Sequence, residues 1–210
     1  MLERAKEVTQ HAGFAYLEYA RYADDLVILV QGSRRQEWLL RAVDRRLREE
    51  LAKLDLRLNE EKSRTVDLTR GESFGFLGFE FRRVRSLRGA WRPQYTPKLK
   101  QRTALLRKLK EVFWSWRSQP VRRVIERINP ILRGWVNYFR KGHASRCFSY
   151  VRHWVVKKVR RHLMRARQRQ GFGWKRWSND WLYAVLGLFK DYRVAGAGEK
   201  AALVDRSHNP

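Results

Sequence analysis

The second half of the chain constrains the fold most, because both its charge and its apolar spacing indicate helices. Residues 96–170 contain 22 Lys and Arg against two acids, Glu111 and Glu126. Apolar residues recur among these charges every three or four positions, which is the spacing of one face of an α-helix. We therefore expect a helical bundle whose solvent face is almost entirely cationic.

Prolines and glycines divide this half into separate elements. Thr96 and Pro97 fit the cap and first turn of one helix, and Pro120 opens the next. Pro130 is expected to kink or interrupt that second helix, since proline removes a backbone donor. Gly142 and residues 171–173 mark further breaks. The expected helices are 97–116, 120–139, 145–168 and 177–189.

The first 95 residues indicate mixed α and β structure. Residues 14–19 and 26–30 are β-prone runs on either side of an acidic turn, and 34–53 has the spacing of an amphipathic helix. Short strands are expected at 56–58 and 65–68, with a polar turn at 59–62. A β-rich stretch at 73–84 then leads through an Arg88-Gly89 turn to a last strand. The fold class predicted is α+β with antiparallel hairpins, divided into 1–95, a helical domain at 96–194 and a flexible tail at 195–210.

Charge and cysteine content narrow the class of function. A net charge of +26 favours a polyanionic partner, with nucleic acid ahead of an anionic membrane surface. No apolar run approaches the roughly 18 residues of a membrane helix, and the first residues do not resemble a secretory signal. The single Cys147 excludes an internal disulfide framework and a cysteine-rich zinc site. An intracellular, cytoplasmic setting is therefore expected.

Two adjacent carboxylates, Asp24 and Asp25, lie between the first two β-prone runs. A hairpin that presents acids at its tip can hold divalent metal for phosphoryl transfer, where two Mg²⁺ ions activate a hydroxyl and stabilise the leaving group. The alternative is an ordinary solvated turn, because Asp is common in turns.

Four motifs in order distinguish these readings. They are Tyr22-Ala23-Asp24-Asp25, then Leu58-Asn59-Glu60-Glu61-Lys62-Ser63, then Phe76-Leu77-Gly78-Phe79, and finally Ile131-Leu132-Arg133-Gly134-Trp135-Val136-Asn137-Tyr138-Phe139-Arg140. The first three resemble consecutive motifs of reverse transcriptases, and the fourth resembles the maturase signature of group II intron proteins. The chain thus resembles the carboxy-terminal half of a group II intron-encoded reverse transcriptase and maturase, with part of a polymerase palm at 1–95 and a thumb or maturase domain after it.

The resemblance implies a role for each matching residue. Asp24 would bind both Mg²⁺ ions and Asp25 would lie beside them, while Tyr22 and Ala23 border the primer end. Lys62 would lie near the incoming triphosphate and protonate pyrophosphate; the alternative is a solvated turn lysine. Leu77 and Gly78 would form the primer grip. If the resemblance is set aside, Gly78 is interpreted as an ordinary bulge glycine in a strand.

The resemblance also predicts an incomplete metal site. The family's first metal-binding Asp lies tens of residues before the catalytic hairpin, whereas here only Glu3, Glu7 and Glu18 precede Asp24. The expectation is that this chain alone does not polymerise, and that a second polypeptide supplies the fingers and the missing Asp. The alternatives are a non-enzymatic RNA-binding splicing factor with a relic motif, and a fragment of a full enzyme.

The expected partners are group II intron RNA and a DNA primer or target, with no membrane. Lysine and arginine contacts to phosphate would give affinity through counterion release. Tryptophans among them could stack on unpaired bases, although most fall on apolar helix faces and fit a core. The cations expected to bind nucleic acid are Arg102, Lys108, Arg122, Arg123, Arg133, Arg140, Lys157, Lys158, Arg160 and Arg161.

Overall fold

A computed structural model of the chain describes residues 17–31 and 37–196. These residues form two compact units, one that extends to Val66 and one that begins at Asp67. Most of the buried apolar side chains belong to the second unit.

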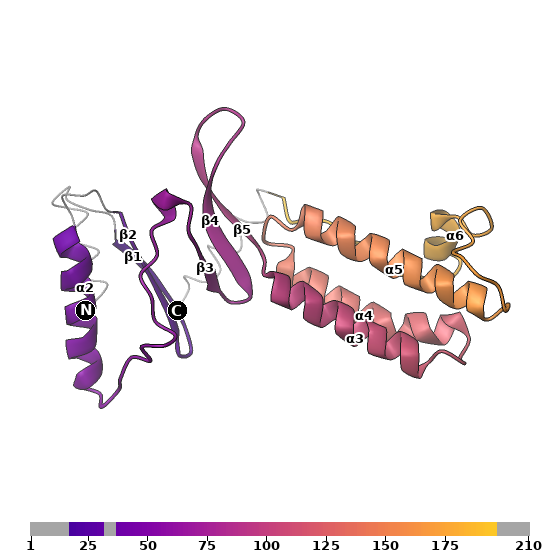
Figure 1. The fold of residues 1–210 in the computed structure, drawn as a ribbon, viewed down its shortest axis with the longest axis horizontal. Helices are drawn as coiled ribbons and strands as arrows, with labels where there is room; N and C mark the ends of the chain where they lie inside the picture. Colours follow the sequence, from indigo (N-terminus) through magenta and orange to yellow (C-terminus); the bar gives the residue numbers. More distant parts are fainter. Residues whose placement is uncertain (1–16, 32–36, 197–210) are drawn as a thin grey trace. The chain divides into compact units, whose positions relative to one another are not determined.

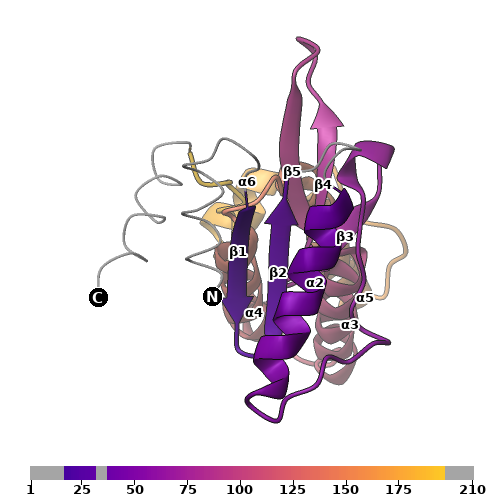
Figure 2. The ribbon, with the colours of Figure 1, turned by 90° about the vertical axis from the view of Figure 1, so that its left-hand side faces the viewer.

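The first unit contains one hairpin and one helix. Strands β1 (Leu17–Tyr22) and β2 (Asp25–Val30) pair antiparallel, and helix α2 (Glu37–Ala52) follows. Figures 1 and 2 both show α2 beside the hairpin. On the solvent face of α2, Arg46 forms ion pairs with Glu49 and Glu50, at 3.1 and 3.0 Å. Such pairs between residues three or four apart stabilise an exposed helix modestly.

A three-stranded antiparallel sheet begins the second unit. Its strands are β3 (Ser73–Phe76), β4 (Phe79–Arg85) and β5 (Trp91–Pro97), with β4 in the centre, and a short 3-10 turn, η2 (Leu68–Arg70), precedes them. Aromatic rings line one face: Phe74 stacks on Phe81 at 5.1 Å, and Phe81 stacks on Tyr95 at 5.5 Å. Cross-strand aromatic pairs of this kind fix the register of neighbouring strands.

Four helices complete the second unit. Helices α3 (Leu99–Ser115), α4 (Val121–Phe139) and α5 (Ser145–Arg165) lie side by side, and the short helix α6 (Asn179–Ala184) packs near the end of α5 (Figure 1). Short connections hold α3, α4 and α5 together as neighbours, as expected for an antiparallel bundle. Ser178 is the N-cap of α6, and its side chain accepts a hydrogen bond from the backbone N–H of Trp181 at 3.1 Å.

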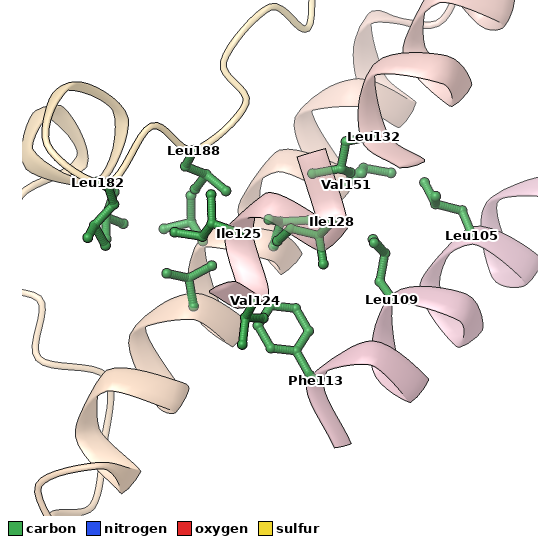
Figure 3. Close-up of a cluster of buried hydrophobic side chains, with 14 of the residues drawn as sticks. Leu105, Leu109, Phe113, Val124, Ile125, Ile128, Leu132, Val151, Leu182 and Leu188 are labelled. Atoms are coloured by element: carbon green, nitrogen blue, oxygen red, sulfur yellow. The ribbon is translucent and has the colours of Figure 1, made fainter. Parts of the chain in front are cut away.

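Two clusters of buried side chains form the core of this unit. The larger is built from the inward faces of α3, α4 and α5, and Figure 3 shows its side chains converging between the helices. The smaller joins the end of α4 to the start of α5 through Val136, Phe139, Ala144 and Phe148. Phe79 of the sheet contacts Phe139 with ring centroids 4.9 Å apart, so the sheet and the helices share this second cluster.

Residues 185–195, here called the C-terminal strap, follow α6 and contact α4. The amide of Asn129 donates to the carbonyl of Gly187 at 2.8 Å and accepts from the N–H of Phe189 at 2.9 Å. Farther along, Arg140 forms an ion pair with Asp191 at 2.9 Å, and its carbonyl accepts from the N–H of Ala195 at 2.8 Å. The strap is therefore fastened to α4 at two places.

The α+β class is confirmed, and most elements lie where the sequence predicts them, but the last helix is shorter than predicted, Asn179–Ala184 instead of 177–189. Residues 56–58 and 65–68 are exceptions, because they form no strand, and the chain forms the 3-10 turn at 68–70 instead. Pro97 is also not a helix start: it closes β5, paired with Phe79, and α3 begins after Lys98. Residues 14–16 and the tail after 196 lie outside the described residues.

Pro130 does not interrupt α4, which continues from Val121 to Phe139. The proline lies on the exposed side of the helix. The carbonyl that loses its helical partner there can be hydrated, which lowers the cost of an internal proline. The predicted interruption is therefore wrong, and the predicted kink stays a prediction.

The compact units do not divide where the composition changes. The sequence placed a domain boundary near 95, whereas the units divide after Val66, because the sheet packs on the helices through Phe79. The functional division at 95 stays a prediction.

Candidate nucleic-acid interface

Asp24 and Asp25 lie at the tip of the β1–β2 hairpin. Tyr22 pairs with Asp25, so Ala23 and Asp24 form a two-residue turn, in which Ala23 has φ +50. Tyr22 and Asp25 stand directly opposite each other, which places their side chains on one face of the hairpin. All four residues are exposed. The structure thus brings the predicted motif together at an accessible turn, with backbone strain at its first position.

The hairpin offers the ligand type that Mg²⁺ prefers, since carboxylate oxygens bind it well. Among the described residues, however, there is no group of three or more His, Cys, Asp or Glu side chains that could hold a metal ion. Glu18 lies in β1, while Glu3 and Glu7 fall outside the described part of the chain. Two exposed carboxylates fit a metal site only if further ligands join them.

Lys62 lies in the polar turn predicted at 59–62. Its backbone N–H donates to the carbonyl oxygen and to Oδ1 of Asn59, at 3.1 and 3.2 Å. The guanidinium of Arg48 on α2 pairs with Glu60, lowers the pKa of that carboxyl, and fastens the turn to the helix. The ammonium of Lys62 is exposed. Its predicted role at the triphosphate remains a prediction.

Leu77 and Gly78 form the two-residue turn between β3 and β4. Both have positive φ, +45 and +75, as type I′ hairpin turns require. The carbonyl of Leu77 accepts from the hydroxyl of Tyr138 at 3.0 Å, and that of Gly78 accepts from the N–H of Lys98 at 2.9 Å. The turn is therefore fixed to α4 and to Lys98, the residue that precedes α3. A Cβ on Gly78 would meet only ordinary contacts at 3.5 Å, so backbone conformation, and not space, requires glycine here.

Most of the predicted phosphate-binding cations lie on the surface of the helices. Lys108, Arg122, Arg123, Arg133, Lys157 and Arg161 are exposed. Arg102, Arg140 and Lys158 are half-buried, and Arg102 lies over the ring of Tyr150 at 4.4 Å. Burial, followed by the nearby Arg161, lowers the pKa of Lys158. Helix α5 carries no acidic residue, so its surface has a cationic field with no internal neutralisation.

Arg160 differs from the other cations that were predicted to bind nucleic acid, because it is buried. Its side chain is only 1% exposed, and its guanidinium donates to the carbonyls of Trp177 and Gly173 and to Asn179 Oδ1, the last at 2.9 Å. Burial lowers the pKa of this guanidinium, but an arginine remains charged. Its Nη1 and Nη2 atoms donate inside the protein and its Nε is buried, so the side chain holds the loop after α5 and does not reach the surface.

At the end of α5, Arg161 is joined by Arg165 and Arg169, two arginines that are not among the cations predicted from the sequence. Arg161, Arg165 and Arg169 line a pocket of about 360 Å³, together with Gln168, Gln170 and Gly171. The spacing of four residues between Arg161 and Arg165 places them on one helix face, a signal that was readable from sequence. Arg169 joins them because the chain turns after α5, which the sequence did not reveal.

Comparison with known proteins bears on the helical part of this surface. Residues 102–181 match the family model of the group II intron, maturase-specific domain. No curated protein matches the chain. This stretch is therefore similar to the C-terminal region of group II intron maturases, as the motif at 131–140 predicted. Among the described residues, no helix has both the length and the apolar character needed to cross a membrane.

Proposed function

We propose that this chain binds group II intron RNA through its helical domain and assists the splicing of that RNA. The family match supports the proposal, because residues 102–181 include α4 and α5, the helices that expose the predicted phosphate-binding cations. Folded RNA is recognised largely by shape, by phosphate and by 2′-hydroxyl groups, and a broad cationic surface suits the phosphate part of this recognition.

The test is RNA binding as a function of salt. Each phosphate contact releases counterions, so the slope of log affinity against log salt should have a magnitude of roughly 5 or more. The measurement compares a group II intron RNA with an unrelated folded RNA of equal length, and follows splicing of the intron RNA at low magnesium. A flat salt response, or equal affinity for both RNAs with no effect on splicing, would contradict the proposal.

We further propose that the Asp24–Asp25 hairpin contributes metal ligands to an RNA-directed DNA polymerase. In this proposal Asp24 binds Mg²⁺, Lys62 lies near the triphosphate, and Leu77-Gly78 contacts the primer strand. A companion half, on this or on another polypeptide, supplies the fingers and the remaining carboxylate. Bound Mg²⁺ would activate the primer hydroxyl and stabilise the leaving group. The exposed position of both carboxylates at the hairpin tip supports the proposal.

The experiment uses Asp24→Ala, with Asp55→Ala, an exposed aspartate outside the hairpin, as the matched control. Primer extension is measured with the chain alone and after addition of the companion half. We expect activity only with the companion, and its loss in Asp24→Ala alone. Extension by the isolated chain would contradict the composite site.

A non-enzymatic splicing factor is the second candidate. The observation that favours it is that the described residues hold no cluster of three metal-binding side chains. This candidate predicts that Asp24→Ala leaves splicing support unchanged and that no companion half restores DNA synthesis.

A further inference from the structure

The loop between α5 and α6 places two aromatic rings against α5. Gln168, Gly171 and Gly173 have positive φ, at +56, +90 and +60, and they reverse the chain after the helix. The loop returns Phe172 and Trp174 to the helix surface, with their ring centroids 6.0 Å apart. His153 of α5 lies beside Trp174, with ring centroids 6.3 Å apart and planes 18° from parallel.

Trp174 rests on a fixed cation but remains open to solvent. The guanidinium of Arg160 lies 4.4 Å from the centroid of the indole ring. Because Arg160 is buried and anchored to backbone carbonyls, it holds that side of the ring in place. Trp174 nevertheless keeps 46% of its surface exposed, whereas Trp177 on the same loop is 5% exposed and part of the core. A rigid, exposed indole of this kind is a platform for a flat ring.

Cations surround the platform on the side of α5. Arg161 and Lys157 lie over the ring of Phe172, at 5.0 and 5.8 Å from its centroid. Arg161 also lines the pocket that contains Arg165 and Arg169, and no acidic residue lines that pocket. Arginines that converge without a carboxylate are suited to a phosphate group, which they can bind through paired donors.

We propose that Trp174 stacks on an unpaired base of RNA while the pocket of Arg161, Arg165 and Arg169 holds a phosphate of the same strand. The inference rests on the proposed RNA binding and assigns to it one site and one kind of nucleotide. A base within an A-form duplex is already stacked on its neighbours, so only a splayed base can reach the indole. The cationic pocket and the aromatic platform together match the two parts of a nucleotide, its phosphate and its base.

The test compares Trp174→Leu, Trp174→Phe and the control Trp91→Leu. Trp91 is also exposed, at 52%, and has a guanidinium over its ring at 4.7 Å, but it lies on β5, away from this loop. The probes are a single-stranded RNA of about 12 nucleotides, the same RNA paired with its complement, and DNA of the same sequence. Circular dichroism and Tm establish that each variant is folded.

We expect Trp174→Leu to weaken single-stranded RNA binding by about tenfold, from the known effect of removing one stacked aromatic ring. Trp174→Phe should restore most of this affinity, while Trp91→Leu and duplex binding should change by less than about twofold. Arg165→Gln and Arg169→Gln should each lower the salt slope for the single strand by about one.

Equal binding of the single strand by wild-type protein and a folded Trp174→Leu variant would overturn the inference, as would an equal loss for duplex RNA. Equal affinity and an equal loss for DNA would overturn its assignment to RNA. In each of these results the wild-type protein still binds RNA. Failure of the proposed function differs, because wild-type protein would then show no salt-dependent RNA binding at all.

Discussion

Replacing Arg160 by methionine should destabilise the helical domain without changing the salt dependence of RNA binding. Arg161→Met should reduce the salt dependence of RNA binding without changing the stability of the domain. The two arginines are adjacent on α5, but Arg160 is buried while Arg161 is exposed. Methionine keeps a similar length and flexibility and removes the charge together with its donors.

The size of the effect follows from the bonds that are lost. Arg160 donates to the carbonyls of Trp177 and Gly173 and to Asn179. Hydrogen bonds from a charged group contribute about 1.5–3 kcal/mol each, but removing the buried charge also relieves its desolvation cost. A net loss of about 2 kcal/mol is expected, which for a domain of this size lowers Tm by roughly 4–8 °C. Arg161→Met should leave Tm within about 1 °C, because surface substitutions usually change stability little.

The assay combines thermal unfolding with binding to duplex RNA over a range of salt concentrations. Duplex RNA avoids any contribution from Trp174, which rests on Arg160. The slope of log affinity against log salt should fall in magnitude by about one in Arg161→Met and remain unchanged in Arg160→Met. An Arg160→Met protein with wild-type Tm and a reduced slope would refute the reasoning, since it would place that guanidinium on phosphate.

Three further predictions concern stability, each measured by urea unfolding. Gly142→Ala should lower the free energy of unfolding by about 1–3 kcal/mol, because the new Cβ would lie 2.6 Å from the ring of Phe79. Gly134→Ala should raise it by up to about 1 kcal/mol, because a Cβ at this helical position would have nothing within 4 Å. Equal effects of the two substitutions would contradict this reasoning. Asn129→Ala should lower the free energy of unfolding by about 2 kcal/mol, because it removes two hydrogen bonds to the strap. An unchanged urea midpoint would show that these hydrogen bonds contribute nothing to stability. Hydrogen bonds from arginines lower the pKa of Asp191, so its stabilisation, below about 1 kcal/mol, is present above about pH 4 and is lost as the pH falls further. The difference between Asp191→Asn and wild type should therefore be largest at pH 6 and should shrink as the pH falls below about 4, and a constant difference would exclude the carboxylate charge as the cause.

The helices were predictable because their signal is local. An apolar residue every three or four positions specifies α3, α4 and α5 without knowledge of what they pack against. The same holds for the tight turn at 23–24, where short apolar runs on both sides define the hairpin. The turn at 77–78 was not predicted, because residues 73–84 have the pattern of one β-rich stretch, whereas the structure divides them into β3 and β4.

The burial of individual cations was not predictable, because it depends on contacts that are distant in sequence. Nothing in the local pattern separates Arg160 from Arg161; the difference arises when the loop after α5 folds back and places carbonyls over one of them. The predicted helix start at Pro97 and the predicted interruption at Pro130 were wrong for a related reason. Proline rules describe backbone donors, but whether a missing donor matters depends on pairing and solvent at that position, as at the end of β5 and on the exposed side of α4.

The C-terminal strap has a consequence for how this domain can be produced in isolation. The family match ends at residue 181, but Leu182, Leu186 and Leu188 are core residues, and Phe79 completes the second cluster from the other end of the chain. A protein cut to residues 102–181 would expose both clusters to water and would be expected to aggregate. The smallest stable piece should run from about Asp67 to Ala195. The segment matched by the family model is therefore shorter than the segment that folds.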